Sequence, residues 1–140
     1  MKKIFCTLIF AYCGFYAFGQ NQDAIVGTFM TDGKSKIEFF KTGDTYSGKI
    51  VWLKNPNDDA GNPRKDFKNP DKSLRDRPLI GLVTITELKY EGNGKYVNGK
   101  AYRPSDGDVI KIKITAKADG SIDVTGTKFG ISLTQNWKRE

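Results

Sequence analysis

The chain has 140 residues, no histidine, and 23 Lys and Arg against 16 Asp and Glu, a net charge of +7. This length suits one domain of ordinary size. The lack of histidine excludes Ser-His-Asp and Cys-His catalytic sites and the usual zinc sites. The basic residues are scattered rather than clustered on one face, which argues against a nucleic-acid partner.

The first 19 residues are typical of a secretory signal. Two lysines follow Met1, an apolar run of 16 residues begins at Ile4, and the small residues Ala17 and Gly19 precede Gln20. A membrane anchor is the weaker alternative, because a spanning helix needs about 20 apolar residues. We therefore expect residues 1–19 to be a signal peptide and residues 20–140 an exported protein of the periplasm or medium, with no membrane-spanning segment.

Both cysteines of the chain, Cys6 and Cys13, lie inside the predicted signal. The bulky Tyr12 before Cys13 argues against lipoprotein processing. After cleavage the protein has no thiol for a disulfide, a nucleophile or a metal ligand. We expect its stability to come from packing alone.

Eight stretches after the signal have the composition of β-strands. In "DVIKIKIT", Ile110, Ile112 and Ile114 share one face and the lysines the other, which is the alternation of a half-buried strand. The other stretches are rich in β-branched and aromatic residues and lie between turn residues. The predicted strands cover residues 24–31, 35–42, 45–54, 82–91, 95–103, 108–117, 121–127 and 131–138.

Short turns separate most of these strands. "TDGK", "KTGD", "EGNGK", "PSDGD" and "KADGS" place Gly beside Asp, Asn or Thr, as tight hairpins require. Sequential strands should therefore pair antiparallel. The residues by themselves leave open a meander that closes into a barrel and a two-sheet sandwich. An outer-membrane barrel is disfavoured, because strands such as "SKIEFFK" lack an unbroken lipid-facing apolar band.

The third and fourth strands are joined by a long charged stretch, residues 55–81, which we call the 55–81 connection. Its segment "NPDKSLRDRP" predicts one short helix, with Asn69 as N-cap, Pro70 at the first helical position and Pro78 beyond the end. We expect the connection to cover one end of the barrel. Leucines, and Phe67 beside them, would press toward the opening, while guanidinium groups hold backbone carbonyls or a carboxylate of the rim. The predicted cover residues are Leu74, Arg75, Arg77 and Leu79.

The same connection carries five aspartates, at positions 58, 59, 66, 71 and 76. Paired-carboxylate catalysis needs two rigidly held groups, one with a pKa raised by burial. A solvated stretch interleaved with Arg and Lys lowers such pKa values instead, so we predict no catalytic residue. An EF-hand comparison starting at Asn55 places oxygen-bearing residues well but puts glycine at position seven rather than six. We predict no bound metal and no cofactor.

Aromatic and branched residues on the strands are the candidate ligand-binding residues. Trp52 shares strand parity with Ile50, and Trp137 shares it with Leu133 and Gln135. An eight-stranded barrel either fills its interior with such side chains or holds one small ligand. The two interpretations stay open here. The predicted ligand-binding residues are Phe39, Ile50, Trp52, Tyr102, Ile112 and Trp137.

The blocks "GKIVWLKNP", "NPDKSLRDRPLIGL", "GKAYRPSDG" and "TQNWKR" together resemble the bacterial domain of unknown function family 2147, which consists of small exported proteins. The resemblance extends over residues 20–140. It implies a single all-β domain, an antiparallel lipocalin-like barrel of about eight strands with a pocket for a small apolar molecule. "VGTF" is similar to a Gly-x-Trp pattern, with Phe29 in place of Trp. The resemblance implies that Arg139 or Lys138 of the last strand leans on that ring.

The functional prediction is a non-catalytic barrel that binds or carries a small apolar or amphipathic molecule in the cell envelope. One alternative is a packed structural or interaction module with a protein or glycan partner, and a more distant one is an unrecognised carboxylate or lysine enzyme. Cavity size separates the first two, since a ligand site of useful size has at least roughly 300 Å³. The sequence does not specify the ligand or the oligomeric state.

Overall fold

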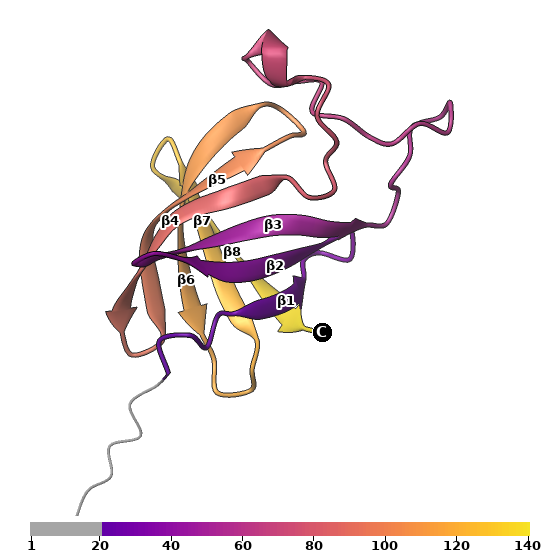
Figure 1. Cartoon of the computed structure of the whole chain (residues 1–140). Coiled ribbons are helices and arrows are strands. Elements are labelled where there is room, and N and C mark those ends of the chain that lie inside the picture. The colour runs from indigo at the N-terminus through magenta and orange to yellow at the C-terminus, as the bar shows by residue number, and fades with distance from the viewer. Residues whose placement is uncertain (1–20) are drawn as a thin grey trace, which may run out of the picture.

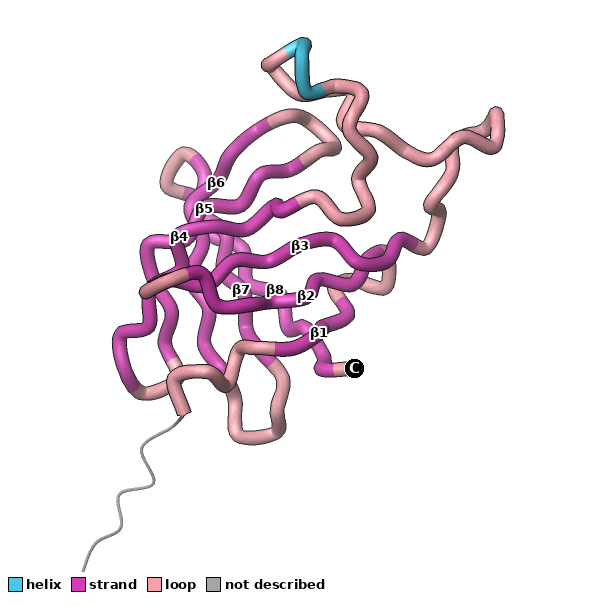
Figure 2. Tube along the Cα trace, viewed as in Figure 1, coloured by secondary structure: helices cyan, strands magenta, loops and turns pink. Residues whose placement is uncertain are grey.

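Eight strands follow one another in chain order around a closed antiparallel barrel, and the last strand pairs with the first (Figures 1 and 2). The computed structural model describes residues 21–140, so the predicted signal, residues 1–19, lies outside them. The barrel prediction is confirmed. The strands are β1 (Gly27–Met30), β2 (Ser35–Thr42), β3 (Thr45–Leu53), β4 (Val83–Gly92), β5 (Lys95–Arg103), β6 (Asp108–Ala116), β7 (Ile122–Lys128) and β8 (Ile131–Arg139).

The predicted strand boundaries agree with the observed ones to within one residue, except at β1. That strand begins at Gly27 rather than at residue 24. The residues before it form turns, in which Ala24 N donates to Asn21 O (3.0 Å) and Val26 N donates to Asp23 O (2.9 Å). Turn hydrogen bonds have thus taken the backbone groups that a longer strand would use. No helix within residues 21–140 is long and apolar enough to span a membrane.

One end of the barrel, the closed end, is filled by aromatic rings. Tyr46 and Tyr96 pack edge to face with centroids 5.4 Å apart, and Phe29 and Phe39 do the same at 5.8 Å. Such edge-to-face pairs are favoured by the ring quadrupole. Ile25, from the turn before β1, is fully buried, and its N–H donates to Tyr96 Oη (3.2 Å). The N-terminal turn therefore plugs this end.

Arg139 of β8 clasps the same end from outside. Its guanidinium carbon lies 4.6 Å from the centroid of the Phe29 ring, and Nη1 donates to Val26 O at 3.0 Å. A Cβ at Gly27 would lie 2.4 Å from Arg139 Nη1, so only glycine leaves room for this contact. The cation–ring contact implied by the family resemblance is confirmed, and Arg139 rather than Lys138 makes it.

The other end, which we call the mouth, is bordered by the β1–β2, β5–β6 and β7–β8 turns and by the 55–81 connection (Figure 1). The connection is folded rather than slack. Arg64 N donates to Pro56 O (2.9 Å), Asp66 N to Arg77 O (3.0 Å) and Leu79 N to Arg64 O (2.9 Å). It also seats on the β5–β6 turn, because a Cβ at Gly107 would meet Lys68 O at 2.2 Å. The hydrogen bonds thus fold the connection on itself, and the contact with the β5–β6 turn helps to hold it at the mouth.

Candidate ligand-binding site

The barrel contains a cavity of about 1020 Å³ that opens at the mouth. Trp137 lies at the floor of the cavity, and the centroid of its ring is 6.3 Å from the centroid of the Phe39 ring in the closed end. Above this floor the walls are mainly aliphatic. The apolar lining residues include Ile37, Ile50, Leu53, Leu79, Ile85, Ala101, Ile110, Ile112, Val124, Ile131 and Leu133.

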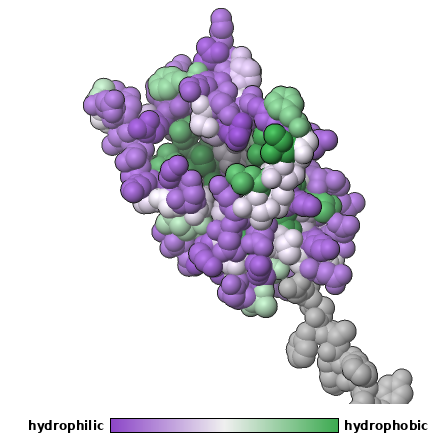
Figure 3. All heavy atoms as spheres, turned by 180° about the vertical axis from the view of Figure 1, so that it is seen from behind, coloured by the Kyte–Doolittle hydropathy of each residue, from purple (hydrophilic) through white to green (hydrophobic). Residues whose placement is uncertain are grey.

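On the β7–β8 side, apolar side chains of the cavity wall are exposed. Ile131 and Leu133 line the cavity and are 76% and 68% exposed, while Phe129 at the hairpin tip is 90% exposed. Viewed from behind, apolar side chains gather around a hollow near the mouth (Figure 3). Exposed apolar side chains grouped in this way are typical of a binding surface rather than of a solvated strand.

Four of the six predicted ligand-binding residues line this cavity. Ile50 and Ile112 are buried in its wall, Trp137 stands at the floor, and Tyr102 lies toward the mouth. Phe39 does not line the cavity, because it is 1% exposed and packed beneath the floor between Phe29 and Trp137. Its place is in the core.

Trp52 also lies outside the cavity, and the expected shared face with Ile50 is wrong. The pairing of β2 with β3 shifts at Lys36 and Ile37, so that Lys36 faces Trp52 and Ile37 faces Ile50. A bulge of this kind inserts one residue and reverses the alternation beyond it. Trp52 turns outward, where Lys36 Nζ lies 5.5 Å from its ring centroid, and Leu53 takes the inward position.

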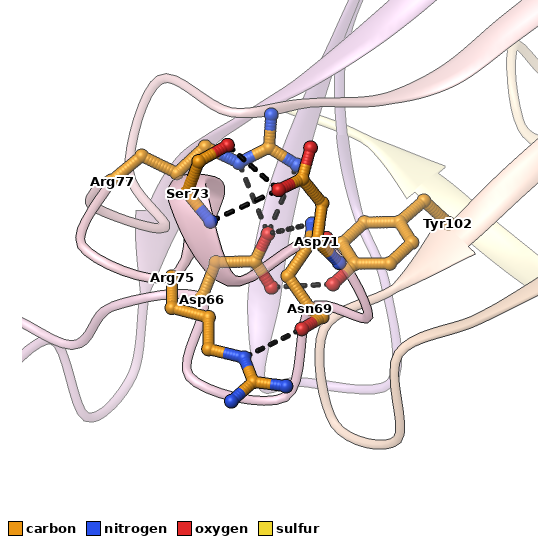
Figure 4. A network of polar contacts seen from close by, with 7 residues as sticks. All are labelled: Asp66, Asn69, Asp71, Ser73, Arg75, Arg77 and Tyr102. Carbon is orange, nitrogen blue, oxygen red and sulfur yellow. Dashed lines mark hydrogen bonds and ion pairs between the residues drawn. The ribbon is translucent and has the colours of Figure 1, made fainter.

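A buried carboxylate, Asp66, fastens the 55–81 connection to β5 (Figure 4). Tyr102 Oη donates to Asp66 Oδ1 at 2.5 Å. Asn69 Nδ2 donates to Oδ2 at 2.8 Å, and Arg77 donates to the same oxygen through Nε (3.0 Å) and Nη2 (2.9 Å). The Arg77 guanidinium carbon also lies 5.9 Å from the Tyr102 ring centroid. Every oxygen of this fully buried charge is thus satisfied, as burial of a carboxylate requires.

The pKa values of the two acids in this network move in opposite directions. Burial raises the pKa of Asp66, but the hydrogen bonds from Tyr102, Asn69 and Arg77 and the charge of Arg77 outweigh it, leaving the pKa below its ordinary value. Burial, and then the Asp66 carboxylate, raise the pKa of Tyr102 to about 12. Asp66 is therefore a structural anion at neutral pH. The expectation that it is solvated is wrong, although the expected lowering of its pKa is found.

The predicted cover residues have different places in the structure. Arg77 does bind a carboxylate, but that carboxylate belongs to the connection itself, and Arg75 Nε donates to Asn69 O (2.7 Å). Leu79 is half-buried against the core and lines the cavity. Leu74 does not press on the mouth, because it is 38% exposed in a helical turn that points away from the barrel (Figure 1).

The short helix is found as the 3-10 turn η1 (Lys72–Leu74), and its N-cap is Asp71 rather than Asn69. Asp71 Oδ1 accepts hydrogen bonds from Ser73 N at 2.9 Å and from Ser73 Oγ at 2.7 Å. Asn69 is buried, and its amide group bonds Asp66 and the N–H of Asp71 (2.8 Å). The side chain of Asn69, which the sequence predicts as the N-cap, is therefore part of the Asp66 network instead.

Three basic residues that the sequence interpretation did not single out for the site line the cavity near the mouth. Arg64, Lys65 and Lys68 flank Asp66 in the segment "RKDFK", residues 64–68, which we call the basic segment. Phe67 of the same segment lines the cavity too and is 58% exposed. In the sequence, the only sign of this arrangement is one acid among three cations. The position of these cations at the mouth follows from the burial of Asp66, which the sequence does not show.

Within residues 21–140, no group of three or more Asp, Glu, Cys or His side chains is arranged to hold a metal ion. Asp66, at position twelve of the EF-hand-like spacing, is already bound by Arg77. The neighbouring Asp58 serves the backbone. Asp58 Oδ1 accepts from the N–H groups of Ala60 and Asn62, both at 2.9 Å. This is the Asx geometry of a turn.

A comparison with solved structures agrees with this barrel fold. The structure is similar to that of protein HP1028 from the human pathogen Helicobacter pylori, which is described as belonging to the lipocalin family. The two share 27% sequence identity with a TM-score of 0.73 over 83% of this chain and 82% of that one. No curated protein matches the chain. Residues 27–139 match the profile of the family described as "Uncharacterized protein conserved in bacteria (DUF2147)", and the chain therefore belongs to this family.

Proposed function

We propose that this protein binds a small apolar or amphipathic molecule inside its barrel and carries it in the cell envelope. The observation that carries the proposal is the open cavity of about 1020 Å³, whose walls are aliphatic and aromatic. Ligand pockets typically measure about 300–1000 Å³ and are lined mainly by apolar side chains. A fully packed interaction module would have no such space. The lipocalin-like fold of the similar structure supports the same proposal.

The proposed role is non-catalytic. Among the described residues of the site, the fully buried Asp66 and the half-buried Tyr102 bond each other, and both are committed to holding the 55–81 connection. A general acid or base must reach its substrate and hold a pKa near the working pH. The lowered pKa of Asp66 and the raised pKa of Tyr102 move both groups away from that range.

Native mass spectrometry of the protein purified from its own envelope tests the proposal. We expect a population that carries an additional lipid-sized mass, released on gentle activation. A ligand-free spectrum, together with no binding of a neutral apolar dye such as N-phenyl-1-naphthylamine, would show that the cavity is not a binding site.

A cavity-filling variant makes the same test specific. Ala101 lines the cavity wall from β5, so Ala101→Phe places a ring in the space that a ligand needs. We expect dye binding to fall at least about tenfold, which corresponds to about 1.4 kcal/mol. Lys113→Phe, on the exposed outer face of β6, adds the same ring outside the cavity and is the matched control.

A further inference from the structure

The mouth of the cavity is lined by more cations than anions. Five basic residues line the cavity, Arg64, Lys65, Lys68, Arg103 and Lys128, against two acidic ones, Asp32 and Asp58. Both acids already have partners. Asp32 lies 3.4 Å from Lys34 Nζ, and Asp58 accepts two backbone hydrogen bonds. The acids therefore do not neutralise the five cations.

Two of the five cations are paired outside the cavity. Arg103 Nη2 contacts Asp106 and Asp108, and Lys128 Nζ contacts Asp108 as well. Arg103 Nε is nonetheless buried and has no hydrogen-bond partner among the described residues. Because water cannot reach this nitrogen, a ligand in the cavity cannot reach it either, and a bound anion would not depend on Arg103.

The three cations of the basic segment are less engaged. Lys65 Nζ lies 3.9 Å from Asp76, whose side chain is 91% exposed, and such a pair contributes little. Arg64 uses Nε on Asn55 O (2.8 Å), which leaves its two terminal nitrogens outside that bond. No ion pair of Lys68 occurs among the described residues. The Asp66 network fixes the backbone between these side chains, so their positions at the mouth are set by the fold.

Taken with the apolar walls, this arrangement narrows the ligand class. We infer that the cavity takes an amphipathic anion, with its apolar chain between the walls and its carboxylate or phosphate head at the basic segment. The inference rests on the proposed function and adds the head group to it. Lysine and arginine side chains at the mouth can form charge-assisted hydrogen bonds with anionic oxygens. A neutral head of the same size would gain none of this and would leave the cations without an acceptor.

Displacement of N-phenyl-1-naphthylamine by three ligands of equal chain length provides the test: dodecanoate, dodecyl phosphate and dodecanol. We expect the wild-type protein to bind one or both anions at least about tenfold more tightly than dodecanol at low salt. The preference should shrink as salt rises, because exposed charges are screened. A preference for dodecanoate or for dodecyl phosphate distinguishes a fatty-acid-like ligand from a phospholipid-like one.

The variant Arg64→Gln/Lys65→Gln/Lys68→Gln should bring the anion-to-alcohol ratio to within twofold of one. Its matched control, Lys100→Gln/Lys111→Gln/Lys113→Gln, removes the same charge from the exposed outer face of β5 and β6 and should keep the ratio. Melting temperatures of both variants confirm that they fold. Lys68→Gln alone is the milder variant if the triple one does not.

The outcomes separate the inference from the function beneath it. Equal binding of dodecanol and both anions by the wild-type protein overturns the anionic head but leaves an apolar carrier. Loss of the preference in the outer-face control also overturns it, because general charge rather than the basic segment would then be responsible. Binding of none of the three ligands removes the proposed function, and the inference falls with it.

Discussion

At the scale of single residues, the fold depends on one buried charge more than on any exposed pair. Asp66 is fully buried and bound by Arg77, Asn69 and Tyr102, whereas pairs such as Lys34–Asp32 lie in solvent. Exposed pairs typically contribute about 0–1 kcal/mol. Removing one partner of a buried pair costs about 3–5 kcal/mol, because the remaining charge loses its compensation. The attachment of the 55–81 connection therefore rests on Asp66.

The first prediction is that Arg77→Ala lowers the free energy of unfolding by about 2 kcal/mol. The figure is below the range for fully buried pairs, because Arg77 is 36% exposed and water can approach Asp66 once the guanidinium is gone. Chemical denaturation at pH 7 measures the change. The control Asp76→Asn, at a side chain that is 91% exposed, should alter it by no more than about 0.5 kcal/mol. Equal effects of the two variants would contradict the assigned role of Arg77.

The second prediction concerns acid. The folded pKa of Asp66 is lowered, so its ionised form stabilises the protein fully above the unfolded pKa of about 3.9. This contribution is lost as pH falls through the lower folded value. Asp66→Asn should therefore be less stable than wild type at pH 7 and lose less stability on acidification below about pH 4. The exposed Asp59→Asn should follow the wild-type curve, and parallel acid limbs for Asp66→Asn and wild type would argue against the network.

At the scale of elements, the 55–81 connection divides into a part that is attached to the barrel and a part that projects from it. The basic segment and Leu79 line the cavity, and the backbone bridge of Lys65 with Pro78 ties the two together. Beyond that bridge, η1 has no buried residue. Only the attached part is therefore placed where the sequence interpretation expected a cover, and Leu74 is not in it.

The third prediction contrasts the two parts through their leucines. Leu79→Ala should lower the free energy of unfolding by about 2 kcal/mol, at the low end for truncated core leucines because Leu79 is half-buried. It should also weaken binding of a neutral apolar dye. Leu74→Ala should change both by little, within about 0.5 kcal/mol for stability. Asp58→Asn serves as a second control, because an amide oxygen can accept the same two N–H bonds. If the Leu74 change proved the costlier one, η1 would be the cover after all.

At the scale of the whole molecule, the two ends of the barrel have opposite characters. The closed end is filled by Ile25 and by the rings of Phe29, Tyr46 and Tyr96, whereas the mouth end keeps an open cavity above Trp137. A closed barrel has no free sheet edges through which chains could associate. The packed end supplies stability, and this leaves the mouth end free to stay hollow.

The fourth prediction is that the protein is exported and that its signal is removed. Cleavage before Gln20 follows from the small residues at 17 and 19 behind the apolar run. Intact-mass measurement of protein recovered from the envelope or the medium should show the loss of residues 1–19. Retention of Met1 in that material would contradict the prediction.

The fifth prediction is that calcium does not stabilise the protein, because Asp66, at position twelve of the EF-hand-like spacing, is held by Arg77 and the glycine of that spacing is displaced. Melting temperatures with calcium and with chelator should coincide. An ion present at 100 times its dissociation constant would add about 2.7 kcal/mol of stability, so a calcium-dependent rise in melting temperature would be plain to see.

The sequence alone determined the strands, their antiparallel order and the absence of histidine chemistry. Alternation of isoleucine and lysine, as in 110–114, and glycine turns act within a few residues, so they can be recognised without the fold. Closure into a barrel rather than a sandwich came from the family resemblance, since short-range pattern does not specify which distant strands pair. For the cavity lining, Ile50 and Tyr102 could be predicted from residue type, and Ile112 and Trp137 from residue type and parity.

Only the tertiary structure decided the rest. The bulge opposite Lys36 turned Trp52 outward, the packing of Phe29 against Phe39 took Phe39 into the core, and Tyr102 and Arg77 made a buried anchor of Asp66, an aspartate that looks solvated in sequence. Each outcome depends on residues far apart in the chain. The free energy of burying a side chain is set by its neighbours in space, and local sequence carries no record of these neighbours.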